Sequence, residues 1–251
     1  NVDVQLSTSV KSFIVEEGEI KGVHTPSGDF FAKKFVLATG GLAAPETGST
    51  GEGLSMLATI GHAVKDPDPN LAPLKTNTKW VHGLSGASVD DMTLRYLQDG
   101  KIKLKVRGRS LFTHFVISGP LVINSAHEVK KLLKTGALIA SVDLFPDDDF
   151  GSLDKRLLDL FETQKNKQLK TAMKELLQKK LSETVLRLVD ESIVDVPVHS
   201  VTKDQRKLLV RTMKDLQFPI TGTMGFEWSI VADGGVDPKE VDFKTMRSRL
   251  F

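Results

Sequence analysis

The chain has 251 residues, of which 40% are apolar and 26% are charged, as is ordinary for a globular protein. Its formal net charge of +2 gives no electrostatic case for nucleic acid or a membrane surface as a partner. The absence of cysteine excludes disulfides, thiolate metal sites and cysteine nucleophiles, and it suits a reducing cytoplasm. No apolar run reaches the roughly 18–20 residues of a membrane span, so we expect a cytoplasmic protein without a membrane partner.

The first 38 residues predict strands joined by turns. Apolar and polar residues alternate at 2–6, and two further apolar runs at 10–15 and 20–24 flank a Glu-Glu-Gly-Glu turn. The turn at 26–29 leads to Phe30 and Phe31. By itself this pattern is a generic β-meander.

Residues 35–62 carry the most informative pattern. The apolar run 35–38 predicts a short strand buried on both faces, and Gly40-Gly41 would end it in a tight turn. In open α/β sheets, ligands bind beyond the carboxyl ends of strands, which is where this turn falls.

A helix is expected next, because Leu54, Leu57 and Ile60 recur every three residues. Ser49 and Glu52 have the spacing of a capping box, Thr50 is a second candidate cap, and a glycine follows at position 61 to end the helix. The free N–H groups at 51–53 would favour an anion, although the charge of Glu52 offsets this in part.

The middle of the chain predicts a second β domain. Prolines cluster at 67–73 and suggest an extended crossing between domains, and strand-like alternation follows at 80–106 with Asp99-Gly100 as a hairpin turn. A small barrel or sandwich fits this pattern. Ser118 is expected to cap a helix that runs towards position 133, and residues 138–144 predict one more strand.

The amino-acid composition changes at the acidic segment 146–149. From 152 to about 217 the sequence is rich in Leu, Lys and Glu, with leucines at helical spacing, which predicts an all-α subdomain of about four helices. Thr202 and Gln205 form a second capping-box pair for the last of them. Residues 218–220 return to strand.

Several motifs together resemble a known family. Ala38-Thr39-Gly40-Gly41 and the later Thr50-Gly51-Glu52-Gly53 are similar to the nucleotide-domain segments of FAD-dependent flavoproteins. LFTHFVISGP at 111–120, VADGGV at 231–236 and TMRS at 245–248 resemble the BaiN/YhiN-type flavoprotein family, which usually shows LFTHFGxSGP, VTxGGV and TMxS. The resemblance covers nearly the whole chain in the same order.

This resemblance implies an α/β fold with an insert. We expect part of a glutathione-reductase-like Rossmann FAD-binding domain at 1–75 and 231–251, an insert β-barrel domain at 76–146 and 218–230, and the helical subdomain at 147–217. The chain has no GxGxxG after an N-terminal strand and no closing glycine-rich segment. It therefore resembles the middle of a longer flavoprotein, and we expect it to be inactive and to bind FAD weakly by itself.

The resemblance also implies which residues contact the cofactor. The candidates are Thr39, Gly40, Gly41, Thr50, Gly51, Gly53, Gly234 and Gly235. Structural alternatives stand beside these roles: the glycines at 40–41 could serve only a tight turn, Thr39 could cap its own strand, and the glycines at 234–235 could form a bare turn. In the family these last two lie beside the flavin ring, while Ala232 replaces the usual threonine and removes a hydroxyl.

No residue stands out as a catalytic acid or base. His114 could titrate near neutral pH, but its place between Phe112 and Phe115 favours a packed, hydrogen-bonded histidine. The other five histidines are scattered without HxxxH or HxH spacing, so no metal site is expected. Catalytic residues therefore stay unassigned.

The resemblance implies an FAD-dependent oxidoreductase that transfers hydride or electrons to a small organic substrate, with NAD(P)H or O₂ as redox partner. The resembled family has been linked to steroid-like enone reduction and to aminoketone oxidation, so it does not fix the substrate. Two alternatives stay open. One is a non-catalytic protein- or RNA-binding module, which clustered Lys and Arg on the barrel would favour. The other is a tRNA-modifying flavoprotein, against which the near-neutral charge counts; nucleic acid is not the expected partner.

Overall fold

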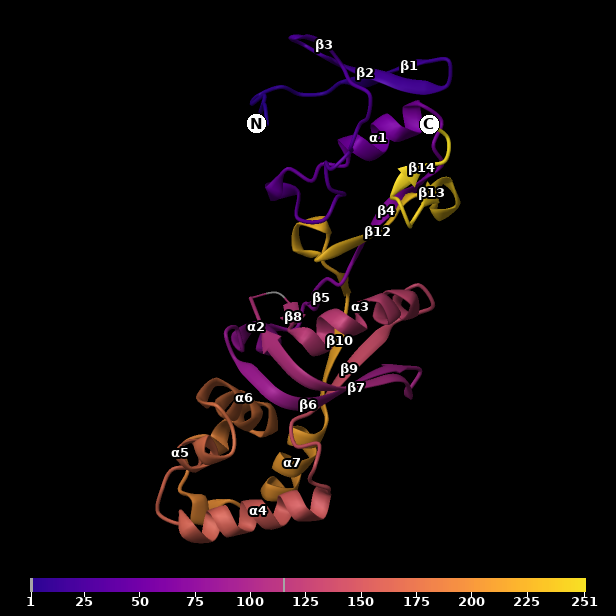
Figure 1. Ribbon diagram of the computed structural model, residues 1–251. Helices are drawn as coiled ribbons and strands as arrows, with labels where there is room; N and C mark the ends of the chain where they lie inside the picture. Colours follow the sequence, from indigo (N-terminus) through magenta and orange to yellow (C-terminus); the bar gives the residue numbers. More distant parts are fainter. Residues whose placement is uncertain (1, 115) are drawn as a thin grey trace. The chain divides into compact units, whose positions relative to one another are not determined.

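The computed structural model describes residues 2–114 and 116–251 (Figure 1). The chain divides into two compact units: unit 1 comprises Asn1–Asn70 and Gly225–Phe251, and unit 2 comprises Leu71–Met224. Each unit is described below by itself. The expected division into three domains stays a prediction.

Unit 1 begins with an antiparallel meander, as predicted. It consists of β1 (Ser12–Glu16), β2 (Glu19–Thr25) and β3 (Gly28–Phe31) in that order. Glu17 and Gly18 both have positive φ, at 51° and 79°, which is the geometry of the two-residue hairpin turn that matches strand twist. The alternating residues before it form no strand, and Val2 and Leu6 are 89% and 82% exposed.

The buried strand expected at 35–38 is not formed. These residues have no regular secondary structure, and Val36 is 91% exposed. A strand that is covered on both faces requires paired neighbours and packed layers, and none of the residues 2–114 and 116–251 pairs with this segment. Its apolar composition alone therefore does not make it a strand.

The predicted helix is present as α1 (Glu52–Thr59), after a short 3₁₀ turn η1 (Pro45–Thr47). It ends as expected: Gly61 has φ of 110°, its N–H donates to Ala58 O, and His62 N–H donates to Leu57 O. This pair of bonds is the Schellman motif, in which a left-handed glycine satisfies the last carbonyls of the helix.

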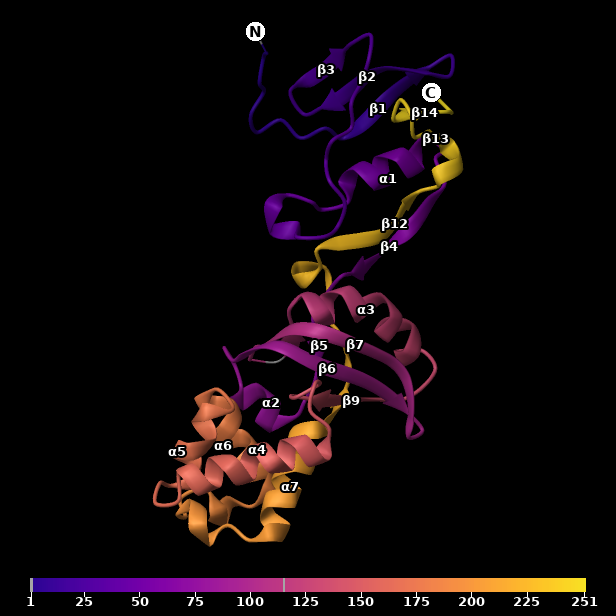
Figure 2. The same ribbon diagram turned by 60° about the horizontal axis from the view of Figure 1, so that its bottom comes forward.

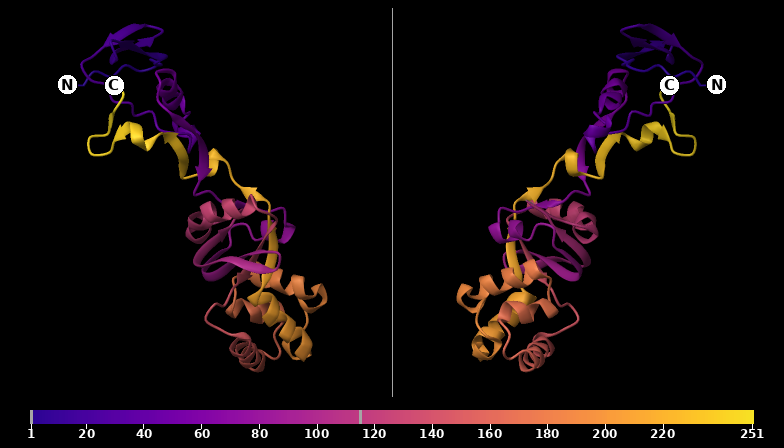
Figure 3. Two further views of the ribbon diagram at one scale, coloured as in Figure 1. Left: turned by 90° about the vertical axis from the view of Figure 1, so that its right-hand side faces the viewer. Right: turned by 90° about the vertical axis from the view of Figure 1, so that its left-hand side faces the viewer.

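Two small antiparallel pairs complete unit 1. The prolines at 67 and 69 lie within β4 (Val64–Asn70), which pairs with β12 (Val231–Val236), and Figure 3 shows these two strands side by side. The chain enters β12 through η5 (Phe226–Trp228) and leaves it through η6 (Pro238–Glu240), β13 (Val241–Asp242) and β14 (Arg247–Ser248).

Unit 2 contains one seven-stranded antiparallel sheet, ordered β10-β9-β6-β7-β8-β5-β11. The strands are β5 (Leu74–Lys75), β6 (Ser88–Gln98), β7 (Lys101–Phe112), β8 (Val116–Ser118), β9 (Leu138–Asp143), β10 (Leu216–Ile220) and β11 (Gly222–Thr223). The first and last strands in this order, β10 and β11, are consecutive in the chain and separated by one residue. The sheet must therefore curl until its two edges meet, which gives the predicted barrel.

Two helices of unit 2 accompany this sheet. The helix α2 (Lys79–Gly83) precedes β6, and α3 (Pro120–Leu133) packs against β7 with its apolar side, while Tyr96 Oη lies 2.9 Å from Ser125 Oγ in the core. Burial raises the pKa of Tyr96. The predicted cap Ser118 is wrong, because Ser118 is the last residue of β8 and Gly119, with φ of 94°, occupies the N-cap position before Pro120.

Four α-helices lie between 150 and 214, on the other side of the sheet from α3 (Figure 2). They are α4 (Phe150–Thr163), α5 (Leu169–Ala172), α6 (Lys179–Val189) and α7 (Lys203–Lys214), with 3₁₀ turns η2 (Met173–Glu175), η3 (Glu191–Ile193) and η4 (Val198–Ser200). Asp149 caps α4, and the Thr202–Gln205 capping box of α7 is confirmed. The leucine pattern at 169–181 is divided between α5, η2 and α6.

One continuous apolar core joins these helices to the sheet. It includes Leu94 of β6, Val122 of α3, Leu157 of α4, Val185 of α6 and Met213 of α7, all fully buried. Shared burial explains why the helical residues and the sheet fall into one unit. Among the described residues, no helix is long and apolar enough to cross a membrane.

Candidate functional site

The start of α1 is the first part of the candidate site in unit 1. Gly51 occupies the N-cap position with φ of 79° and no side chain caps the helix, so the predicted Ser49–Glu52 capping box, with Thr50 as second cap, is wrong. A left-handed entry suits glycine and directs the preceding residues away from the helix amides. Ser49 Oγ instead lies 3.4 Å from Thr47 Oγ1.

The glycine turn at 39–42 packs directly on this helix start. A Cβ atom added to Gly40, whose φ is 71°, would lie 2.5 Å from Ser49 Oγ. A Cβ on Gly53 would collide with Thr39 Oγ1, and a Cβ on Gly51 would lie 3.0 Å from Leu42 Cγ. Two segments whose contacting residues are nine to fourteen positions apart in sequence thus meet through glycine contacts. The structure brings together six of the eight predicted site residues: Thr39, Gly40, Gly41, Thr50, Gly51 and Gly53.

The meeting point offers unused hydrogen-bond donors. Within the part of the chain that the structure describes, the backbone N–H groups of 40–42 and of 51–53 donate to no protein acceptor. Free amides at a helix start attract anions through both hydrogen bonding and the helix dipole. The donor set is of the kind that a dinucleotide pyrophosphate requires, although the carboxylate of Glu52 at the helix start opposes an anion. We call residues 39–42 and 50–53 the glycine cradle.

Gly41 differs from its neighbours in the cradle. Its φ is not in the left-handed region, and an added Cβ would have no atom within 4 Å. Replacing Gly41 with valine should therefore leave the free energy of unfolding within about 0.5 kcal/mol of the parent. If a cofactor approaches this backbone, however, the side chain would occupy its place.

We therefore expect Gly41→Val to lower FAD occupancy of the complete gene product about tenfold or more, because steric overlap with the cofactor should cost at least about 1.4 kcal/mol of binding free energy. The ratio of flavin absorbance to protein absorbance measures this. Gly225→Val is the matched control, since Gly225 lies in the same unit, has φ of −79° and is equally open. Equal flavin content in both variants would contradict a role for Gly41.

The two late glycines are not a bare turn. Gly234 and Gly235 lie in β12 at a bulge opposite β4, with φ of 98° and 95°. A Cβ on Gly234 would lie 2.7 Å from Asp66 O, whereas one on Gly235 would lie 3.8 Å from Leu54 Cδ2 of α1. Gly234 therefore serves the close approach of two strands, and Gly235 faces the helix that carries the cradle. Their placement beside a flavin ring stays a prediction.

A buried histidine cluster was missed by sequence reasoning. His62 Nδ1 lies 2.7 Å from Glu240 Oε2 and its Nε2 lies 3.0 Å from Ser248 Oγ, with the His62 side chain only 2% exposed. Ser248 Oγ also accepts bonds from the N–H groups of Leu250 and Phe251. Since the hydroxyl is held by these bonds, the cluster fastens the C-terminal segment to the end of α1. No local signal could reveal partners separated by 178 and 186 residues.

The remaining candidate for acid–base chemistry is His114. His114 is exposed rather than packed, and Phe115 lies outside the described residues. Among the described residues, no group of three or more His, Cys, Asp or Glu side chains is arranged to hold a metal ion.

A row of basic side chains lies along β7 in unit 2. Lys101, Lys103, Lys105, Arg107 and Arg109 occupy every second position and all are exposed. Arg107 binds Asp91 and Asp147, and Arg109 pairs with Asp90. These hydrogen bonds raise the pKa of Arg107, and the guanidinium lowers the pKa of Asp91.

The three lysines have no such partners. No acidic group among the described residues forms an ion pair with Lys101, Lys103 or Lys105. We call these three the lysine row. Clustered cations on the barrel are the feature that favours an RNA-binding role. The net charge of the whole chain is near neutral and therefore does not reveal this local cluster.

Comparisons with known proteins place this geometry in a family. The profile described as the HI0933-like protein barrel and H2TH domain matches residues 68–231, more than half of the chain. A ribosomal RNA dihydrouridine synthase of Haemophilus influenzae is 30% identical over 219 residues, which are 86% of this chain and 51% of that protein. The protein of the same name in Escherichia coli is 28% identical and covers the same shares, 86% and 51%.

A third relative bears a different name. The 3-dehydro-bile acid delta(4,6)-reductase of Clostridium scindens is 27% identical over 224 residues, 88% of this chain and 54% of that protein. The chain thus spans about half the length of the curated relatives it matches. The profile match and the motifs at 111–120, 231–236 and 245–248 agree, and the chain belongs to the HI0933-like family of flavoprotein oxidoreductases.

Proposed function

We propose that the protein is an FAD-dependent reductase that saturates a carbon–carbon double bond conjugated to a carbonyl group, with a uracil base of RNA as its substrate. The observation that carries the cofactor assignment is the glycine cradle, whose backbone amides are free and whose Gly41 leaves space for a ligand. A Rossmann arrangement of unit 1 around this cofactor belongs to the proposal.

The relatives' names support the reaction class. Dihydrouridine is uridine whose ring double bond, conjugated to a carbonyl, is saturated. A delta(4,6)-reductase of a 3-dehydro bile acid likewise saturates double bonds conjugated to a ketone. One chemistry, the addition of a hydride and a proton across an activated double bond, thus accounts for both names.

The cofactor would supply the hydride, and NAD(P)H is the proposed electron donor. This chain's own residues have the tasks of binding and orientation. The amides of 40–42 and 51–53 would bind the pyrophosphate, and the His62–Glu240–Ser248 cluster holds the C-terminal segment against the end of α1.

The lysine row favours RNA over a steroid as the substrate. A phosphate backbone requires cations that are free of internal partners, and each one that binds a phosphate releases counterions. A bile acid has a single carboxylate and a large apolar surface, and a row of three exposed lysines does not complement such a ligand. The proposed substrate also places the activity in the cytoplasm. The expectation from net charge that nucleic acid is not a partner is not tested by these observations.

The two substrate classes can be compared directly. The complete gene product, reduced with NADPH without oxygen, is mixed with a uridine-containing RNA or with a steroid dienone, and flavin reoxidation is followed by visible absorbance. We expect reoxidation by the RNA and dihydrouridine in its nuclease digest by mass spectrometry. Reoxidation by the dienone alone would contradict the RNA assignment, and a protein without flavin would leave the non-catalytic RNA-binding module as the better account.

A further inference from the structure

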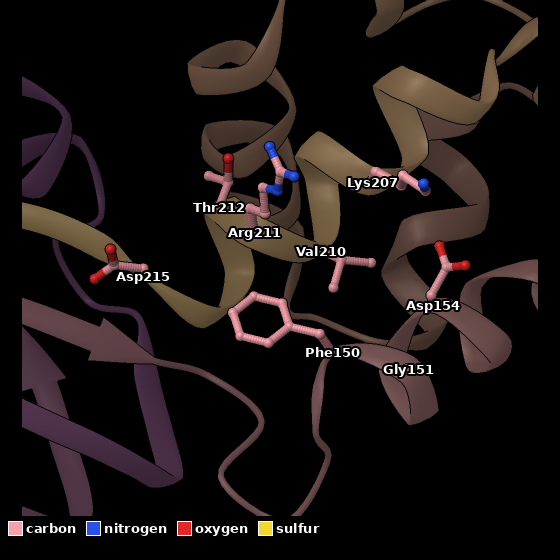
Figure 4. A pocket seen from close by; sticks show the side chains of 8 residues that line it. All are labelled: Phe150, Gly151, Asp154, Lys207, Val210, Arg211, Thr212 and Asp215. Carbon is pink, nitrogen blue, oxygen red and sulfur yellow. The ribbon is translucent and has the colours of Figure 1, made fainter.

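A pocket of about 730 Å³ lies between α4 and α7 of unit 2 (Figure 4). It is lined by Phe150, Gly151, Asp154, Lys207, Val210, Arg211, Thr212 and Asp215. Figure 4 shows the ring of Phe150 lying between the two helices, and 56% of this residue is exposed. At this exposure the ring of Phe150 contributes little to the core and can be contacted by a ligand.

Two basic and two acidic side chains line the pocket, and both acidic groups already have hydrogen-bond partners. Asp154 is engaged by Arg206, with Nε 2.7 Å from Oδ1, and this bond lowers the pKa of Asp154. Asp215 accepts bonds from Ser141 and Gln217.

Lys207 and Arg211 remain without an ion pair in the part of the chain that the structure describes. Lys203 lies four residues before Lys207, so three exposed cations follow one another at intervals of four along α7. Like charges at this spacing repel one another on a helix. The carboxylate of Asp154, whose pKa is lowered by Arg206 and also by Lys207 and Lys203, offsets this repulsion in part, and a bound anion would relieve it further.

The pocket is connected to the lysine row by a chain of contacts within unit 2. Lys105 lies opposite Arg95 in the β6–β7 register, and Arg95 donates to Ser141 Oγ at 3.4 Å. Ser141 Oγ in turn donates to Asp215 Oδ1 at 2.5 Å, at the edge of the pocket. The face of the sheet that carries the lysine row and Arg95 therefore leads to the edge of the pocket. On this path Arg95 is paired with Asp143, Ser141 is buried, and the next cations are those of α7.

We propose that this surface binds a single strand of RNA, with one base stacked on Phe150 in the α4–α7 pocket and the flanking phosphates on Lys207, Arg211 and the lysine row. This inference rests on the proposed function for the choice of RNA and deepens it by naming where the substrate is held. Stacking platforms combined with a cationic groove are how proteins bind single strands without reading their sequence. A small phosphate ligand would require the pocket but not the row.

Binding of a short fluorescein-labelled oligouridine to the 251-residue chain, followed by fluorescence anisotropy, tests the proposal. Phe150→Leu keeps an apolar side chain but removes the stacking ring, and it should weaken binding by about 5-fold to 150-fold. Phe150→Trp keeps a ring and should retain the parent affinity within a few fold. Unchanged affinity in Phe150→Leu would overturn the stacking role.

The cations are tested by salt dependence. Lys207→Ala with Arg211→Ala should flatten the slope of log affinity against log salt by about 1.4, because each phosphate contact on a single strand contributes about 0.7. The matched control is Lys174→Ala with Lys179→Ala, which removes the same charge from exposed positions outside the pocket. Equal slopes in both double variants, or no binding by the parent chain, would overturn the proposal.

A failure of the docking surface can be distinguished from a failure of the proposed reductase function. If the complete gene product still forms dihydrouridine with Phe150→Leu and with the α7 double variant, the reductase stands and the docking surface is wrong. If the pocket variants lose RNA binding while the parent forms no dihydrouridine, the docking surface stands and the reductase assignment is wrong. Thermal unfolding of each variant confirms that these exposed substitutions leave the fold intact.

Discussion

Replacing Lys214 with methionine is expected to lower the free energy of unfolding of unit 2 by about 3–5 kcal/mol. Lys214 Nζ lies 2.8 Å from Asp143 Oδ2, and the two side chains are only 7% and 6% exposed. The same ammonium donates to the carbonyl oxygens of Phe145 and Asp148. Methionine keeps the length of the side chain but leaves the two carbonyls without this donor. The buried Asp143 carboxylate loses one of its two cations and keeps Arg95, whose Nη2 lies 2.9 Å from Oδ2.

Lys131→Met is the matched control for this substitution. Lys131 Nζ also lies 2.8 Å from a carboxylate, that of Glu128, but both side chains are more than half exposed. Exposed pairs of this kind contribute about 0–1 kcal/mol. Urea unfolding, followed by the fluorescence of Trp80 in a Trp228→Phe background, measures both variants. Equal effects of the two substitutions would contradict the structural role of the buried pair.

The loop that Lys214 holds leads to the α4–α7 pocket. Residues 144–149 join β9 to α4, and Phe150 follows directly. Arg156 and Arg107 bind Asp148 and Asp147 of the same loop. The buried ammonium thus fixes the loop that precedes Phe150. If Phe150 stacks on a base as proposed, Lys214→Met should also weaken the binding of oligouridine.

Replacing Gly234 with alanine is expected to destabilise unit 1 by about 3 kcal/mol. Its φ of 98° strains any residue with a Cβ, and the added atom would lie 2.7 Å from Asp66 O and 3.0 Å from Lys65 O. Strain at such positions costs about 1–3 kcal/mol, and overpacking costs a similar amount. Because the obstructing atoms belong to the backbone of β4, only separation of the two strands can make room.

The neighbouring glycine provides the control. Gly235 has nearly the same φ, 95°, but an added Cβ would meet only Leu54 Cδ2 at 3.8 Å, an ordinary contact. Gly235→Ala should therefore cost about 1 kcal/mol, which is the strain alone. Trp228 fluorescence in a Trp80→Phe background reports on unit 1. A smaller loss for Gly234→Ala than for Gly235→Ala would refute the described pairing of β4 with β12.

Local patterns predicted the parts of the fold that local chemistry decides. The hairpin at Asp99-Gly100, with φ of 50° and 72°, and the capping box at Thr202 and Gln205 were predicted correctly because turn and cap geometry depend on a few adjacent residues. The end of α1 at Gly61 belongs to the same class.

Two errors show where local reasoning ends. The segment 35–38 has the composition of a buried strand, but burial depends on neighbours that sequence composition does not reveal. Ser49 has capping spacing, yet the left-handed Gly51 redirects the chain and leaves the helix start without a side-chain cap. In both cases geometry set by other residues decided the outcome.

The glycines of the candidate site could be predicted from the sequence, but the long-range contacts around the site could not. Thr39, Gly40 and Gly53 could be proposed from motif and turn chemistry, and the structure brings them into contact. The union of His62 with Glu240 and Ser248 depends on tertiary folding across most of the chain. The lysine row could be read from its alternation, but its lack of acidic partners required the positions of Asp90, Asp91 and Asp147.

The central claim, that this family member reduces uracil in RNA, is tested most directly by the dihydrouridine content of ribosomal RNA. The gene is deleted in the organism that carries it, ribosomal RNA is digested, and dihydrouridine is quantified by mass spectrometry. We predict that dihydrouridine falls in the deletion strain, returns with the parent gene, and returns only in part with Gly41→Val or Phe150→Leu. An unchanged dihydrouridine content after deletion would contradict the account.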